Sequence, residues 1–136
     1  MWSAAPTLLS AAATLFLATA APAEPTSPCH GRPPAEGVVF RGPVLHVPDG
    51  RTVCVARGFD PGQWIPLEIA DAPRMTARAT LMAVAFGKDV DCAMAADGRG
   101  HCVLGGRSLG SLAADPAAAE AGRAWREAGP DATASR

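Results

Sequence analysis

Cysteine usage is the feature that most constrains what this 136-residue chain can fold into. The four cysteines, Cys29, Cys54, Cys92 and Cys102, all follow residues 1–23, a stretch without Asp, Glu, Lys or Arg. That stretch has a short apolar run followed by small residues, which is typical of a secretory signal peptide. An even number of cysteines in a small exported domain favours disulfides, which reinforce a thin core. We therefore expect a periplasmic or secreted protein with two disulfides.

The end of the predicted signal peptide has two candidate cleavage sites. Ala21-Pro22-Ala23 gives a small-x-small pattern before Glu24, and Ala18-Thr19-Ala20 gives an earlier one. An uncleaved anchor is the alternative, because the run lacks positive residues at its start. Beyond residue 23 no apolar stretch approaches the ~18 residues that a membrane span requires. The remaining chain is expected to have no membrane span.

The spacing of the cysteines predicts how they pair. Cys92 and Cys102 lie symmetrically about Asp97, and Asp97-Gly98 is a typical turn dipeptide. Cysteines opposite each other in such a hairpin are close enough for a disulfide. Cys29 then pairs with Cys54. A zinc site that recruits His101 with His30 or His46 is the alternative, but no two cysteines have C-x2-C spacing, so we expect no metal ligands.

Alternating and helical periodicities predict the order of elements along the chain. Strands are expected at residues 37–47, with a bend at Gly42-Pro43, and at residues 52–56, 64–70, 90–94 and 101–104. A helix is expected over residues 75–86, ending near Gly87. Short helices follow at residues 108–114, capped by Ser108, and at residues 117–128, after Asp115-Pro116.

This order, three strands, a helix and two strands, is the one expected of a small mainly β fold with helices. We predict a five-stranded Greek-key barrel of the OB type. Residues 24–36 are rich in proline and read as an extended arm, residues 37–128 as the domain, and residues 129–136 as a flexible tail. Cys54 is expected on the outward face of its strand, where the arm can reach it.

Charge and aromatic content argue against a general nucleic-acid binder. Lys and Arg number 12 against 13 Asp and Glu, and the chain contains no tyrosine for stacking on bases. A local anion patch is the alternative, built from arginines that lie far apart in the chain: Arg51, Arg74, Arg78 and Arg99. Nucleic acid is thus possible but not favoured, and the sequence names no partner.

Four short segments, in order, resemble the staphylococcal nuclease-like (thermonuclease) family over residues 37–126. They are Asp49-Gly50-Arg51-Thr52, the run WIPLEIADAP, the helix after it, and Asp97-Gly98-Arg99-Gly100 before the last strand. The resemblance implies an OB-fold phosphodiesterase. In that family two carboxylates bind calcium, two arginines hold the phosphate, and a glutamate is the proposed base.

Only two of the family's site residues have counterparts in this chain. The resemblance matches Asp71 to a metal-binding Asp and Arg99 to a phosphate-binding Arg. The other positions have changed: Arg51 replaces the second metal Asp, Pro66 a phosphate Arg, and Arg74 the catalytic Glu.

The positive charge of Arg51 decides whether we expect calcium to bind at the turn. A fixed guanidinium near the position of a divalent cation repels it, so calcium is not expected to bind and no cofactor is expected. Arg51 is instead expected to pair with Asp71, leaving Asp71 and Arg99 as vestigial site residues. We therefore expect a non-catalytic structural or binding module. The alternative is a metal-dependent nuclease or phosphodiesterase that uses Asp71 and Arg99, with Asp49 as a second carboxylate and calcium as its cofactor.

Overall fold

The protein is described from a computed structural model, which defines residues 27–129. The predicted signal peptide and nearly all of the predicted tail lie outside these residues. The elements, in chain order, are β1 (Val39–His46), β2 (Thr52–Ala56), the 3-10 helix η1 (Pro61–Gln63), β3 (Trp64–Glu68), α1 (Arg78–Ala85), β4 (Asp89–Met94), β5 (Gly100–Leu104), β6 (Arg107–Ser108), α2 (Leu109–Ala114) and α3 (Pro116–Ala128).

The fold is mainly β, with all strands in one antiparallel sheet of order β3-β2-β1-β4-β5-β6. β1 is bent: its first half pairs with β4 and its second half with β2, and the register shifts between Val44 and His46. This agrees with the bend predicted from Gly42-Pro43. Six strands are present where five were expected. The extra one, β6, forms because Gly105 and Gly106 adopt positive φ and reverse the chain tightly after β5.

The mainly β prediction is confirmed, but the sheet is open and does not close into a barrel. Within residues 27–129, the segment after β3 meets the start of β5 at one parallel bridge, between Ile69 and Gly100, where the Ala70 N–H also donates to the Gly100 carbonyl at 2.9 Å. β3 and β5 have only five residues each, so the strands end before a longer ladder forms. Gly100 permits this approach, because a Cβ there would lie 2.3 Å from the Leu67 side chain.

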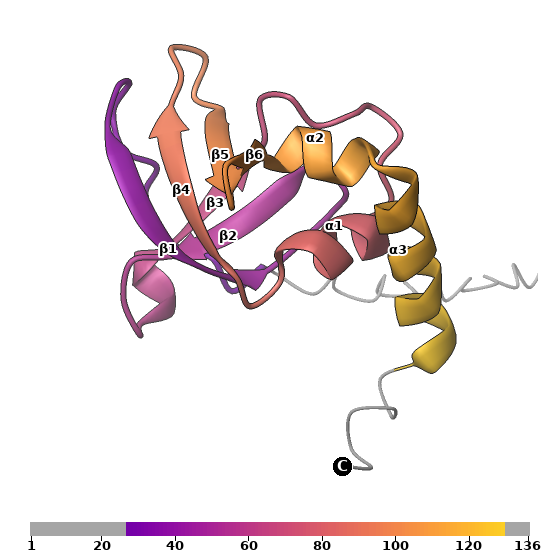
Figure 1. Ribbon diagram of the computed structural model, residues 1–136. Helices are drawn as coiled ribbons and strands as arrows, with labels where there is room; N and C mark the ends of the chain where they lie inside the picture. The colour runs from indigo at the N-terminus through magenta and orange to yellow at the C-terminus, as the bar shows by residue number, and fades with distance from the viewer. Residues whose placement is uncertain (1–26, 130–136) are drawn as a thin grey trace, which may run out of the picture.

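The core lies between the inner face of the sheet and the helices, which are grouped at one side of the molecule (Figure 1). The inner face of β2 and β3 and the residue after β3 are fully or almost fully buried: Val53, Val55, Ile65, Leu67 and Ile69. Leu81 of α1 and Leu109 of α2 close the core from the other side. Alternation along each strand therefore leaves Thr52, Pro66 and Glu68 on the outer face.

The helix boundaries follow the predicted caps. The Ser108 hydroxyl accepts from the Ser111 N–H and the Asp115 carboxylate from the Ala117 N–H, so α2 and α3 begin where predicted. α1 begins at Arg78, three residues later than expected, since residues 73–76 form a turn with a Thr76 N–H to Pro73 carbonyl hydrogen bond. Trp125 anchors α3 by packing edge-on against Phe86, with ring centroids 6.4 Å apart. Among the described residues, no helix is long and apolar enough to cross a membrane.

Both predicted disulfides are confirmed, Cys29–Cys54 and Cys92–Cys102. Cys92 and Cys102 are opposite each other in the β4–β5 register and fully buried. Cys29 holds the arm against the outer face of β2, and the Gly31 N–H donates to the Trp64 carbonyl of β3 at 2.8 Å. Cys54 is completely buried because the arm covers it.

Candidate functional site

The turn before β2 is held by its own aspartate. The Asp49 carboxylate accepts from the Arg51 N–H at 2.8 Å and from the Thr52 hydroxyl at 3.3 Å. Gly50 is required here, because a Cβ would lie 1.7 Å from the Thr76 carbonyl oxygen. Asp49 therefore stabilises the turn, and both of its oxygens are engaged in doing so.

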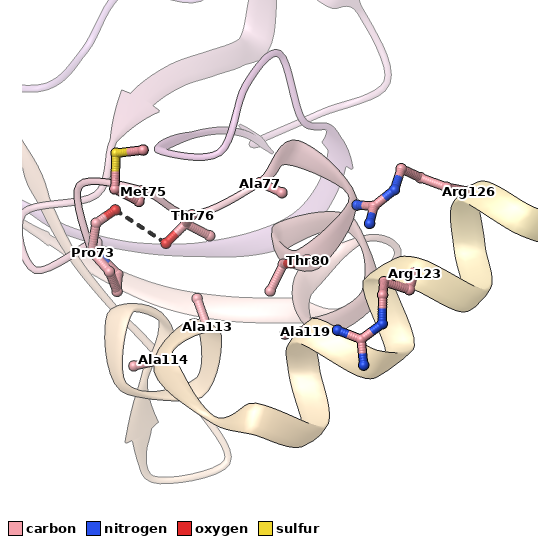
Figure 2. A pocket seen from close by; sticks show the side chains of 10 residues that line it. All are labelled: Pro73, Met75, Thr76, Ala77, Thr80, Ala113, Ala114, Ala119, Arg123 and Arg126. Carbon is pink, nitrogen blue, oxygen red and sulfur yellow. Dashed lines mark hydrogen bonds between the residues drawn. The ribbon is translucent and has the colours of Figure 1, made fainter.

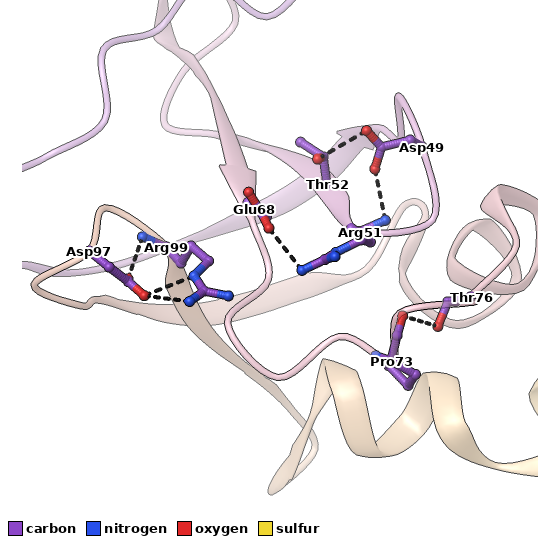
Figure 3. A network of polar contacts seen from close by, with 8 residues as sticks. All are labelled: Asp49, Arg51, Thr52, Glu68, Pro73, Thr76, Asp97 and Arg99. Atoms are coloured by element: carbon purple, nitrogen blue, oxygen red, sulfur yellow. Dashed lines mark hydrogen bonds and ion pairs between the residues drawn. The ribbon is translucent and has the colours of Figure 1, made fainter.

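Arg51 pairs with Glu68, and not with Asp71 as the sequence suggests. Its Nη2 lies 3.0 Å from Glu68 Oε1, and both side chains point into the same region of the outer face (Figure 3). Register explains the difference: Thr52 is directly opposite Glu68, and the Ile69 N–H donates to the Arg51 carbonyl. The Arg51 Nε is buried and has no hydrogen-bond partner among the described residues.

Asp71 lies beyond the end of β3, in the turn that leads to α1. It packs against the first turn of α2, where a Cβ at Gly110 would lie 2.4 Å from the Asp71 carboxyl carbon. Its side chain is otherwise exposed, and it forms no ion pair within residues 27–129. The ion pair between Arg51 and Asp71 that the sequence predicts is therefore not formed.

Arg99 immediately precedes β5 and is paired with Asp97 of the same hairpin. The Asp97 carboxylate accepts from the Arg99 N–H at 3.0 Å and from Nε at 2.8 Å (Figure 3). Hydrogen bonds from the Arg99 backbone and side chain lower the pKa of Asp97 below its ordinary value. Because Ile69 and Gly100 form the bridge, their preceding residues Glu68 and Arg99 are neighbours on the outer face.

The three positions where this chain differs from the family's site residues, Arg51, Pro66 and Arg74, are spread over the outer surface. Pro66 is opposite Cys54 in the β2–β3 register, beside the disulfide that fastens the arm. Arg74 is exposed in the loop between β3 and α1. Glu68 was not recognised as a site residue from sequence. The alternation of Trp64–Glu68 was the available signal, because it puts Glu68 outward opposite Thr52.

The candidate calcium ligands are dispersed or already engaged among the described residues. Calcium takes six to eight oxygen ligands, and no group of three or more His, Cys, Asp or Glu side chains in the described part of the chain is arranged to hold a metal. Asp49 is engaged by the turn, Glu68 by Arg51, and the guanidinium brings a fixed positive charge. The arrangement therefore presents surface guanidinium and carboxylate groups that are joined to one another in ion pairs.

A cavity of about 430 Å³ lies beside this region, between the turn that contains Pro73 and Thr76, α2 and α3 (Figure 2). Alanines line much of it, and Arg123 and Arg126 of α3 stand at its edge. Neither Asp71 nor Arg99 lines it. The cavity therefore does not bring the predicted site residues together.

Acidification is expected to destabilise the fold through His46 of β1. Burial, and secondarily the positive charge of Arg78, lower the pKa of His46 below its ordinary 6.5. As pH falls below that value the unfolded chain takes up the proton first. The free energy of unfolding then decreases until His46 is protonated in the folded state as well. Denaturant titrations at about pH 7.5 and about pH 5 should show this loss, and His46→Gln should reduce it. An unchanged pH dependence in His46→Gln would contradict the assignment.

No family model, curated protein or solved structure matches the chain in the comparisons made with known proteins.

Proposed function

We propose that this chain is an exported, OB-type relative of the staphylococcal nuclease-like proteins that works as a non-catalytic structural or binding module. The observation that carries the proposal is the Arg51–Glu68 ion pair at 3.0 Å. It puts a guanidinium, neutralised by the protein's own carboxylate, at the turn where the resembling family has a metal-binding aspartate.

The strand arrangement supports an OB-type classification. An OB fold is a five-stranded Greek-key barrel that is partly open. Here β1 is the shared neighbour of β2 and β4, and β3 approaches β5 through the Ile69–Gly100 bridge. The short β6 is an addition at the β5 edge. This arrangement is compatible with a barrel whose β3–β5 seam is reduced to one bridge.

The position of the arm is a second argument for a non-catalytic protein, and it does not depend on charge. It is joined to Cys54, and Pro66 lies opposite Cys54 in the register. The outer face beside the position of a family phosphate arginine is therefore covered by the chain itself. Arg99, the retained phosphate arginine, is paired with Asp97 at 2.8 Å. A substrate phosphate would have to share the Arg99 guanidinium with that carboxylate.

Calcium titration and a hydrolysis assay with DNA and RNA test the proposal. We expect no calcium-dependent heat in calorimetry and no calcium-dependent cleavage. The alternative, an enzyme that uses Asp49, Asp71 and Arg99, predicts cleavage that Asp71→Ala or Arg99→Ala abolishes. Asp91→Ala is the matched control, because Asp91 is an exposed carboxylate paired with Arg41 elsewhere on the sheet. Cleavage lost in Asp71→Ala but kept in Asp91→Ala would overturn the non-catalytic proposal.

A further inference from the structure

A second cavity, of about 300 Å³, lies at the opposite end of β2 from Arg51. Its lining residues come from the arm, the end of β2, η1 and the start of β3: Gly31, Arg32, Arg57, Gly62, Gln63 and Ile65. Arg51 precedes β2 and Arg57 follows it, so a five-residue strand, about 15–20 Å, separates this cavity from the Arg51–Glu68 pair. The η1 loop stands clear of the α-helices (Figure 1).

Two arginines and no acidic residue line the cavity. Neither Arg32 nor Arg57 forms an ion pair within the described residues, whereas Arg41, Arg51 and Arg99 each have a carboxylate partner. Asp60, the acidic residue of the same loop, accepts from the Gly62 N–H at 2.7 Å and caps η1. The positive charge of the cavity is therefore not neutralised by its own lining.

Several contacts hold the lining residues in place. The Arg57 guanidinium carbon lies over the Phe40 ring, 5.8 Å from the ring centroid. The backbone N–H of Arg57 donates to the Gln63 carbonyl. Gln63 packs its side-chain amide against Gly58, where a Cβ would lie 2.0 Å from Oε1.

The arm brings Arg32 to the same cavity. Arg32 follows Gly31, which presses so closely on Trp64 that a Cβ would lie 2.7 Å from the Trp64 carbonyl carbon. The Cys29–Cys54 disulfide holds this part of the arm.

We propose that this cavity binds a phosphate group, either free inorganic phosphate or the terminal group of a phosphate monoester. Guanidinium groups donate paired, charge-assisted hydrogen bonds to phosphate oxygens. The volume, at the low end of ligand pockets, suits one such group with part of its substituent. This site is separate from the Arg51–Glu68 region, and it stands whether or not the chain is catalytic.

Titration of the oxidised protein with inorganic phosphate and with methyl phosphate, followed by NMR, tests the proposal. We expect saturable shifts of the Gly31, Gly62 and Gln63 amides. Saturation with inorganic phosphate would identify the free anion as sufficient. Saturation with methyl phosphate alone would identify an esterified group. Absence of saturable shifts with both would overturn the proposal.

Three variants of equal charge change separate this site from general electrostatic attraction. Arg32→Gln and Arg57→Gln are each expected to weaken binding about tenfold, the loss of one charge-assisted hydrogen bond. Arg41→Gln is the control, since Arg41 pairs with Asp91 on another part of the sheet. Its affinity should stay within about twofold of the natural protein. Equal weakening in all three variants would overturn the site.

Discussion

Removing both disulfides is expected to lower the free energy of unfolding by about 6 kcal/mol. Chain entropy assigns about 3.5 kcal/mol to Cys29–Cys54, with a sequence separation of 25, and about 2.7 kcal/mol to Cys92–Cys102, with a separation of 10. Domains of this size have a free energy of unfolding of about 5–15 kcal/mol, so this loss leaves the fold marginal or unfolded. Denaturant unfolding of the Cys29→Ala/Cys54→Ala variant, the Cys92→Ala/Cys102→Ala variant and their combination measures each contribution.

The two bridges are expected to differ in what else they affect. Loss of Cys29–Cys54 frees the arm, so the Gly31 amide, which donates to Trp64, should lose protection from hydrogen exchange. The β4–β5 hairpin should keep its protection in the same variant. Each double variant is therefore the control for the other. An unchanged denaturation midpoint in both would show that the entropic argument fails for this protein.

Restoring nuclease chemistry is expected to require three substitutions at once. Arg51→Asp alone should bind calcium weakly and hydrolyse nothing, because phosphate binding and water activation act as a unit and such residues are strongly non-additive. Pro66→Arg and Arg74→Glu, each alone, should also be inactive. Calcium-dependent hydrolysis is expected only when all three changes are combined. Kinetic assays of the single, double and triple variants with DNA, with and without calcium, measure this.

Arg51→Asp is expected to change the free energy of unfolding in a way that the other two substitutions do not. It removes the Arg51–Glu68 ion pair and places two carboxylates side by side, which should cost about 1 kcal/mol without calcium. Added calcium should raise the Tm of this variant but leave that of the natural protein unchanged. Adding Asp71→Ala to the triple variant is the control, and it should abolish any hydrolysis gained. Turnover by Arg51→Asp alone would contradict the expectation that the three positions act together.

Local patterns in the sequence predicted the secondary structure and the disulfides. The alternation of apolar residues predicted which side chains of β3 and its C-terminal extension face the core, and Ile65, Leu67 and Ile69 are buried there. Ser108 and Asp115 marked the starts of α2 and α3. The symmetry of Cys92 and Cys102 about Asp97 indicated their pairing, which left Cys29 for Cys54. These features depend on residues close in the chain, whose geometry is set by strand and turn conformation.

The tertiary structure decided which distant residues meet. Arg51 pairs with Glu68 because the β2–β3 register puts Thr52 opposite Glu68 and leaves Asp71 beyond the strand end. The sheet stays open because β3 and β5 are short, and Arg32 reaches the cavity of Arg57 because the arm is bonded to Cys54. No local pattern contains these contacts. They follow from strand lengths, register and a crosslink acting together, since a shift of one residue would turn Glu68 from the surface into the core.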